Sequence, residues 1–143
     1  MSPPCPRARG TRAGLVLPIV GLLCSACSGA GGVDEPAAPQ DVAVRFHAAV
    51  SQGDGEGACA LLAPETRREL VQTARRACAR AVVAEDIPDA GAVRQSHRFG
   101  TQAQVRLEGD TVFLGEFADG WRVVAAACTP REVLPYDCRV KGA

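Results

Sequence analysis

Seven cysteines give this chain of 143 residues its most distinctive chemistry. Four of them, Cys59, Cys78, Cys128 and Cys138, lie beyond residue 50, and an even number of cysteines in an exported chain is typical of disulfide bonds. Three pairings are formally open. We favour Cys59 with Cys78, which would join neighbouring helices, and Cys128 with Cys138, which would close a loop after the last long strand. A metal site is the alternative, but these four form no close C-x-x-C pair, so we predict neither metal nor cofactor.

Residues suited to acid–base catalysis are few and scattered. An isomerase-type site needs a carboxylate base in an apolar cavity and a donor that faces the developing oxyanion. His97 lies in a predicted strand, and His47, next to Phe46 in the first predicted helix, is expected to be a boundary residue rather than a base. Asp110 and Asp119 occupy turn positions that account for them. We expect structural roles for all four and predict no catalytic residue.

Glu116 is the one acid inside a predicted strand. It shares strand parity with Val112 and Leu114, whereas Phe113 and Phe117 form the more strongly apolar opposite face. We therefore expect Glu116 to be exposed, as polar residues on strands ordinarily are.

The residues we favour for contact with a ligand or partner are Tyr136 and Asp137. They lie inside the loop that a Cys128–Cys138 bridge would close, and a rigid loop presents side chains with little loss of entropy on binding. The alternative is that Tyr136 plugs the open end of the sheet, since an aromatic side chain contributes much to a small core.

The spacing of apolar residues changes midway along the chain, from a helical period to the alternation typical of strands. Apolar residues four apart predict a first helix from near Asp41, whose carboxylate would cap it, to Gly53. Asp54 would cap a second helix, Pro64 would begin a third, and residues 73–84 are expected to be helical again. Alternation then predicts strands at 93–98, 103–107, 111–117, 121–128 and 138–141, with a tight turn at Asp119-Gly120. The predicted fold is α+β, with N-terminal helices packed on a curved antiparallel sheet.

The N-terminal segment carries a targeting signal. Arg7, Arg9 and Arg12 precede an apolar run, residues 13–23, that is too short to span a bilayer. The run ends in Leu-Cys-Ser-Ala-Cys, which resembles the lipobox of bacterial lipoprotein precursors and makes Cys27 the expected lipid-bearing first residue. We therefore predict a signal peptide at 1–26, a flexible tether at 27–39 and a folded domain at 40–143, held on the extracytoplasmic face of the cell membrane. Cleavage after Ala26 or Ala30 would instead give a secreted protein.

Charge gives no reason to expect nucleic acid as a partner. The chain has 16 basic and 16 acidic residues, and loss of the three signal-peptide arginines would leave a charge of −3. Nucleic-acid binders instead concentrate positive charge on one face. The one basic cluster is interrupted by acids and is expected to be a solvated helix surface rather than a site for a polyanion or phospholipid; it comprises Arg67, Arg68, Arg75, Arg76 and Arg80.

Several motifs together resemble a known group of proteins. They are FHAAVSQGD (46–54), ALLAP (60–64), QVRLEGDTVFL (104–114), DGWRV (119–123), CTP (128–130) and PYDC (135–138). This pattern is similar to that of a group of uncharacterised actinobacterial lipoproteins, whose helix–helix–sheet order resembles the NTF2-like superfamily. The resemblance implies an NTF2-like cone, a fold that hosts isomerases and dehydratases as well as non-catalytic binding modules. We expect a non-catalytic module that binds an envelope protein or a small apolar ligand. The alternative is an NTF2-like enzyme of isomerase or dehydratase type with a small apolar substrate.

Overall fold

The computed structural model describes residues 36–133 and 135–143. The predicted signal peptide, the lipidation site at Cys27 and most of the tether lie outside these residues. The described part contains four helices followed by five strands, as the change of period predicts. The helices are α1 (Pro39–Ser51), α2 (Gly55–Leu61), α3 (Pro64–Ala74) and α4 (Cys78–Val82). The strands are β1 (Val93–Phe99), β2 (Gln102–Leu107), β3 (Thr111–Phe117), β4 (Gly120–Thr129) and β5 (Asp137–Lys141).

The helix starts follow local chemistry, with one correction. Asp54 caps α2 by accepting the Gly57 N–H at 2.9 Å, and Pro64 begins α3 as expected. Asp41 does not cap α1, however, and instead lies in its first turn. The helix begins earlier, at Pro39, because the fixed φ of proline suits the first helical position and its missing N–H costs nothing there.

The helix predicted for residues 73–84 is also corrected. Arg75 adopts a left-handed conformation (φ 52°) that ends α3, and α4 begins only at Cys78. A disulfide joins Cys78 to Cys59 of α2, with the two Cα atoms 6.1 Å apart. Closing a loop of this size stabilises the fold by about 3 kcal/mol in the chain-entropy model, and the bridge ties the short α4 to α2.

The five strands form one open antiparallel sheet in the order β1-β2-β3-β4-β5. Its last two strands are joined by the second disulfide, Cys128–Cys138, between directly paired residues. The turn before β4 differs from expectation by one position. Phe117 pairs with Gly120, so the loop residues are Ala118 and Asp119, and Gly120 (φ +107°) already belongs to β4.

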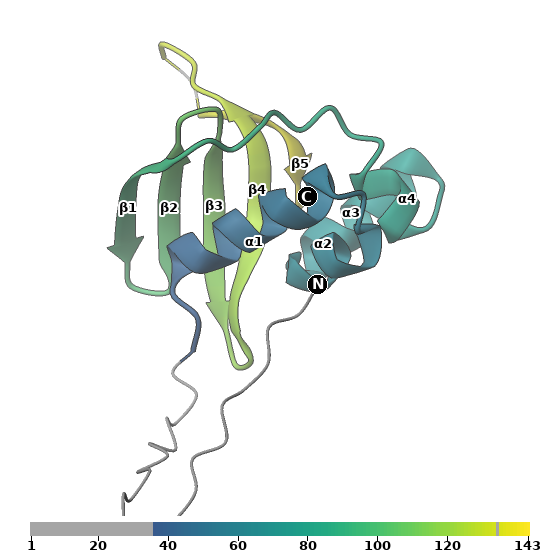
Figure 1. Cartoon of the computed structure of the whole chain (residues 1–143), viewed down its shortest axis with the longest axis horizontal. Coiled ribbons are helices and arrows are strands. Elements are labelled where there is room, and N and C mark those ends of the chain that lie inside the picture. Colours follow the sequence, from purple (N-terminus) through teal and green to yellow (C-terminus); the bar gives the residue numbers. More distant parts are fainter. Residues whose placement is uncertain (1–35, 134) are drawn as a thin grey trace, which may run out of the picture. The chain divides into compact units, whose positions relative to one another are not determined.

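The core lies between α1 and one face of the sheet. Figure 1 shows α1 running across the strands, with α2, α3 and α4 gathered on the side of β5. The largest fully buried side chains come from both layers: Val42, Phe46, Thr66, Val82, Val105, Val112, Leu114, Val123 and Val140. The junction of α2 and α3 extends the sheet edge, since the Ala63 N–H donates to the Val123 carbonyl at 2.8 Å. Helices and sheet thus share one continuous hydrophobic core.

The two faces of β3 are the reverse of what its composition indicates. Val112 and Leu114 are 0% and 1% exposed beneath the helices, whereas Phe113 is half-buried and Phe117 is 40% exposed on the other face. Compact aliphatic side chains fill the space under α1, so the larger aromatic rings lie on the face that the helices do not cover.

Candidate functional site

A buried histidine–aspartate pair joins α1 to the sheet. His47 Nε2 lies 3.0 Å from Asp110 Oδ2, and the two residues are 5% and 6% exposed. His47 belongs to the third turn of α1, while Asp110 follows the β2–β3 turn immediately before Thr111. The sequence predicts His47 to be a boundary residue and accounts for Asp110 by its turn position alone, whereas both side chains are buried and paired. Tertiary packing brings together two residues that are 63 positions apart.

Three backbone N–H groups also bind the Asp110 carboxylate. Oδ1 accepts from Thr111 at 2.6 Å and from Cys128 at 2.8 Å, and Oδ2 accepts from Ala127 at 2.9 Å. Pairing of β3 with β4 ends at Phe113 and Ala125, so the carboxylate supplies acceptors to the stretch of β4 beyond that point. Ala127 there has a positive φ of 53°. The carboxylate thus holds an irregular piece of β4 next to the Cys128–Cys138 bridge.

The four donors explain why a carboxylate is tolerated in the core. A buried charge is costly unless it is paired and hydrogen-bonded, and each Asp110 oxygen receives two donors. A neutral imidazole donates from one nitrogen and accepts at the other. Because the carboxylate only accepts, the Nε2 atom of neutral His47 carries the proton, and Nδ1 is left as an acceptor.

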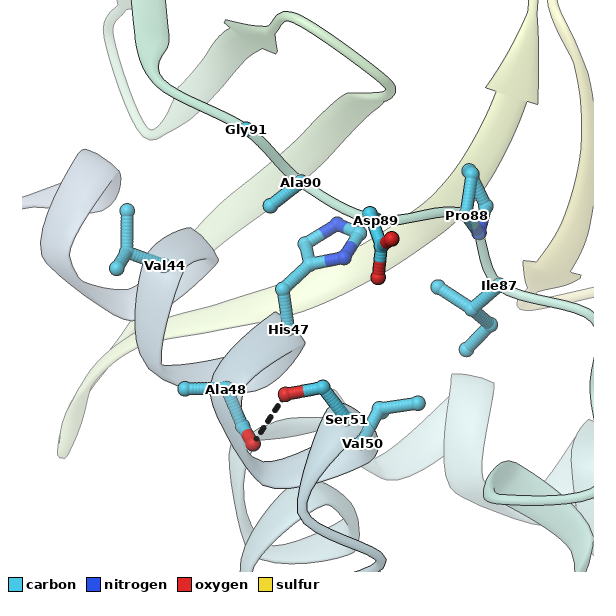
Figure 2. A pocket seen from close by; sticks show the side chains of 10 residues that line it. All are labelled: Val44, His47, Ala48, Val50, Ser51, Ile87, Pro88, Asp89, Ala90 and Gly91. Carbon is cyan, nitrogen blue, oxygen red and sulfur yellow. Dashed lines mark hydrogen bonds between the residues drawn. The ribbon is translucent and has the colours of Figure 1, made fainter.

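The second nitrogen of His47 lines a recess between α1 and residues 87–91. The recess has a volume of about 310 Å³, and Figure 2 shows the imidazole standing between the helix and that segment, with Nδ1 on the side of Asp89. Its apolar lining comprises Val44, Ala48, Val50, Ile87, Pro88 and Ala90. In the described part of the chain, every buried side-chain nitrogen and oxygen has a hydrogen-bond partner. Nδ1 makes no hydrogen bond to the described residues, so it is not one of these fully buried atoms. It is therefore open to the recess.

Two other polar side chains line the recess. The Ser51 hydroxyl donates to the Ala48 carbonyl at 2.9 Å, which leaves its oxygen as an acceptor (Figure 2). Asp89 is exposed, and within the described residues no ion pair or hydrogen bond engages its carboxylate. When His47 is neutral, the polar side-chain atoms that face this space are therefore all acceptors.

Tyr136 and Asp137, the residues favoured for contact, lie on either side of the start of β5. Tyr136 is half-buried and packs edge-on against Phe113, with ring centroids 5.1 Å apart. Asp137 is exposed and pairs with Arg131 at 2.7 Å and with Lys141 at 3.7 Å. The hydrogen bond from Arg131 lowers the Asp137 pKa, with further contributions from the positive charges of Arg131 and Lys141.

Three of the residues considered for an isomerase site, His97, Glu116 and Asp119, are exposed to solvent. His97 and all other residues of β1 are exposed. Glu116 is exposed and pairs with Arg98 at 2.7 Å, and the Arg98 guanidinium lies 5.0 Å from the ring centroid of Trp121. Asp119 accepts a hydrogen bond from the Arg122 side chain, which lowers its pKa. None of these groups reaches the His47 recess.

A signal for His47 exists in the sequence. It lies four residues after Ala43 and three before Val50, which places it on the apolar stripe of α1 rather than at its edge. Asp110 carries no comparable signal, because its environment comes from β4 and α1, which are distant in sequence.

Comparison with known protein families, with curated proteins and with solved structures finds no match for this chain. The two disulfides indicate an oxidising, extracytoplasmic environment. Within residues 36–133 and 135–143, none of the helices has the length and apolar character needed to cross a membrane. Across the same residues there is no cluster of three or more His, Cys, Asp or Glu side chains suited to holding a metal ion.

Proposed function

We propose that this protein is a lipid-anchored, extracytoplasmic binding module without catalytic activity. The disulfides support the compartment, because they persist where the environment is oxidising. The N-terminal arginines, the apolar run and the lipobox-like residues before Cys27 support the anchor. Several acyl chains on Cys27 would hold it firmly, since each buried methylene contributes about 0.8 kcal/mol.

The observation that carries the non-catalytic part of the proposal is the filled interior. Phe46 and Val42 of α1 are at most 2% exposed and pack in one core with buried side chains of the sheet, such as Leu114. An isomerase-type cone would need a cavity there, with an acid or histidine directed into it. Glu116 and His97 are instead exposed. Binding through surface recesses and loops therefore fits better than chemistry within the cone.

The NTF2-like relationship is part of this proposal. The motifs that resemble actinobacterial lipoproteins favour it, and so does a helix that crosses one face of an antiparallel sheet. We place the partner-binding surface at the loop closed by Cys128–Cys138, where Asp137 is exposed and Tyr136 is held against Phe113.

Photo-crosslinking in intact cells tests this function. A photoreactive phenylalanine replaces Tyr136 in one strain, and replaces Val83, a 38% exposed residue after α4, in the control strain. We expect a discrete adduct with an envelope protein, identified by mass spectrometry, from position 136 and not from position 83. A Cys27→Ala variant should lose its attachment to the membrane fraction. Equal adducts from both positions, or a cytosolic wild-type protein, would refute the proposal.

A second candidate is an enzyme of isomerase or dehydratase type, and the orientation of His47 favours it. Asp110 fixes the imidazole so that Nδ1 can accept a proton from a molecule in the recess. The recess is less well equipped for the rest of the reaction, because no side-chain donor faces a developing oxyanion: the Ser51 hydroxyl is already engaged with Ala48. This candidate is tested by NMR measurement of the rate at which the α-protons of cyclohexanone exchange in heavy water. Acceleration that disappears in His47→Gln would establish the enzyme.

A further inference from the structure

We infer that the recess between α1 and residues 87–91 binds a small protonated amine carried on an apolar body. This deepens the proposed binding function and rests on it. The ammonium group would lie between His47 Nδ1 and the Asp89 carboxylate, and the apolar body would contact Val44 and Ile87.

The charge and hydrogen-bonding pattern of the recess select this ligand. With a neutral His47, its polar side chains offer the Nδ1 lone pair, the Asp89 carboxylate and the Ser51 oxygen, all of which accept. A primary ammonium supplies up to three donors and a positive charge. A carboxylate ligand would meet Asp89 with like charge, and a hydroxyl ligand would satisfy only one acceptor.

The rigidity of the imidazole strengthens the inference. His47 is 95% buried and is fixed through Nε2 by Asp110, which is itself held by three backbone N–H groups. An acceptor held in place before binding loses little entropy when a ligand arrives. The apolar lining matches ordinary small-molecule sites, in which a few polar groups orient a mainly apolar ligand.

Three probes of similar size test the selection: cyclohexylamine, cyclohexanol and cyclohexanecarboxylate. The full chain, labelled with ¹⁵N and kept in mild detergent, is titrated at about pH 8, where an ordinary imidazole is neutral and an alkylamine is protonated. We expect the His47 spectrum to show a proton on Nε2 and none on Nδ1. Cyclohexylamine should shift the Nδ1 resonance upfield in a saturable way, and the carboxylate should not shift it.

Matched variants locate the probe. Asp89→Asn should weaken cyclohexylamine binding about two- to fivefold, as expected for one exposed charge pair. It should leave the affinity for cyclohexanol unchanged. Asp86→Asn is the control, because it removes a nearby charge that pairs with Arg139 and does not line the recess. Val44→Phe, at a 42% exposed position in the lining, should block the binding of cyclohexylamine and cyclohexanol without disturbing the core.

Several results would overturn the inference. They are a proton on Nδ1 in the free protein, preference for the carboxylate, equal loss of affinity in the Asp86 and Asp89 variants, and absence of any saturable shift with the amine. The crosslinking experiment at position 136 probes a different surface in cells. Its outcome therefore tests the binding function separately, whatever the probes do.

Discussion

The two ends of β3 each carry an acid, and their surroundings could hardly differ more. Asp110, just before the strand, is buried under α1 with four hydrogen-bond donors. Glu116, near the other end, is exposed and pairs with Arg98 beside Trp121. Because the Asp110–His47 pair is buried, its loss would leave an uncompensated polar group in the core, whereas water screens the Glu116–Arg98 pair. The same chemical group therefore serves packing at one end and surface solvation at the other.

The largest effect is expected at Asp110. Asp110→Asn should lower the free energy of unfolding by about 3–5 kcal/mol. The NH₂ group of asparagine would face backbone N–H donors, and the negative charge beside His47 would be lost. Glu116→Gln is the matched control and should cost less than about 1 kcal/mol. Urea unfolding followed by circular dichroism measures both. Similar losses in the two variants would contradict the contrast between the two ends.

The disulfides sharpen the comparison, because only Cys128–Cys138 adjoins the Asp110 end. Removing either bridge by paired alanine substitutions should cost about 3 kcal/mol, slightly more for Cys59–Cys78, which closes the longer loop. The His47→Gln substitution should be non-additive with loss of Cys128–Cys138, because Asp110 binds the Cys128 N–H. It should add to loss of Cys59–Cys78 within about 0.5 kcal/mol. Additivity with loss of Cys128–Cys138, together with non-additivity with loss of Cys59–Cys78, would contradict this expectation in a double-mutant cycle.

The smallest effect concerns Asp137, whose pKa is lowered by the hydrogen bond from Arg131. A lowered folded-state pKa stabilises the protein above the unfolded pKa, and this contribution disappears as pH falls through the folded value. Carboxyl ¹³C NMR should give an Asp137 midpoint below the ordinary value of about 3.9. Arg131→Gln should raise the midpoint toward that value and leave the His47 resonances unchanged. An unaltered midpoint would mean that the ion pair does not form in solution.

Much of the fold was predictable because it depends on local sequence. The Asp54 cap, Pro64 at the start of α3 and the alternation of Ala103, Val105 and Leu107 each act within a few residues. The faces of β3 were harder to assign. Glu116 is exposed as predicted, although it shares a face with the buried Val112 and Leu114. It is not buried because it lies near the end of the strand.

By itself, the sequence determined the α+β class and the antiparallel sheet, since periodicity and turns are properties of short segments, and it favoured the two cysteine pairs that the structure contains. Only the tertiary structure decided that His47 and Asp110 meet in the core and that Nδ1 faces a recess. The reason is physical: a carboxylate is stable there only when α1, the start of β3 and the irregular end of β4 together supply its donors.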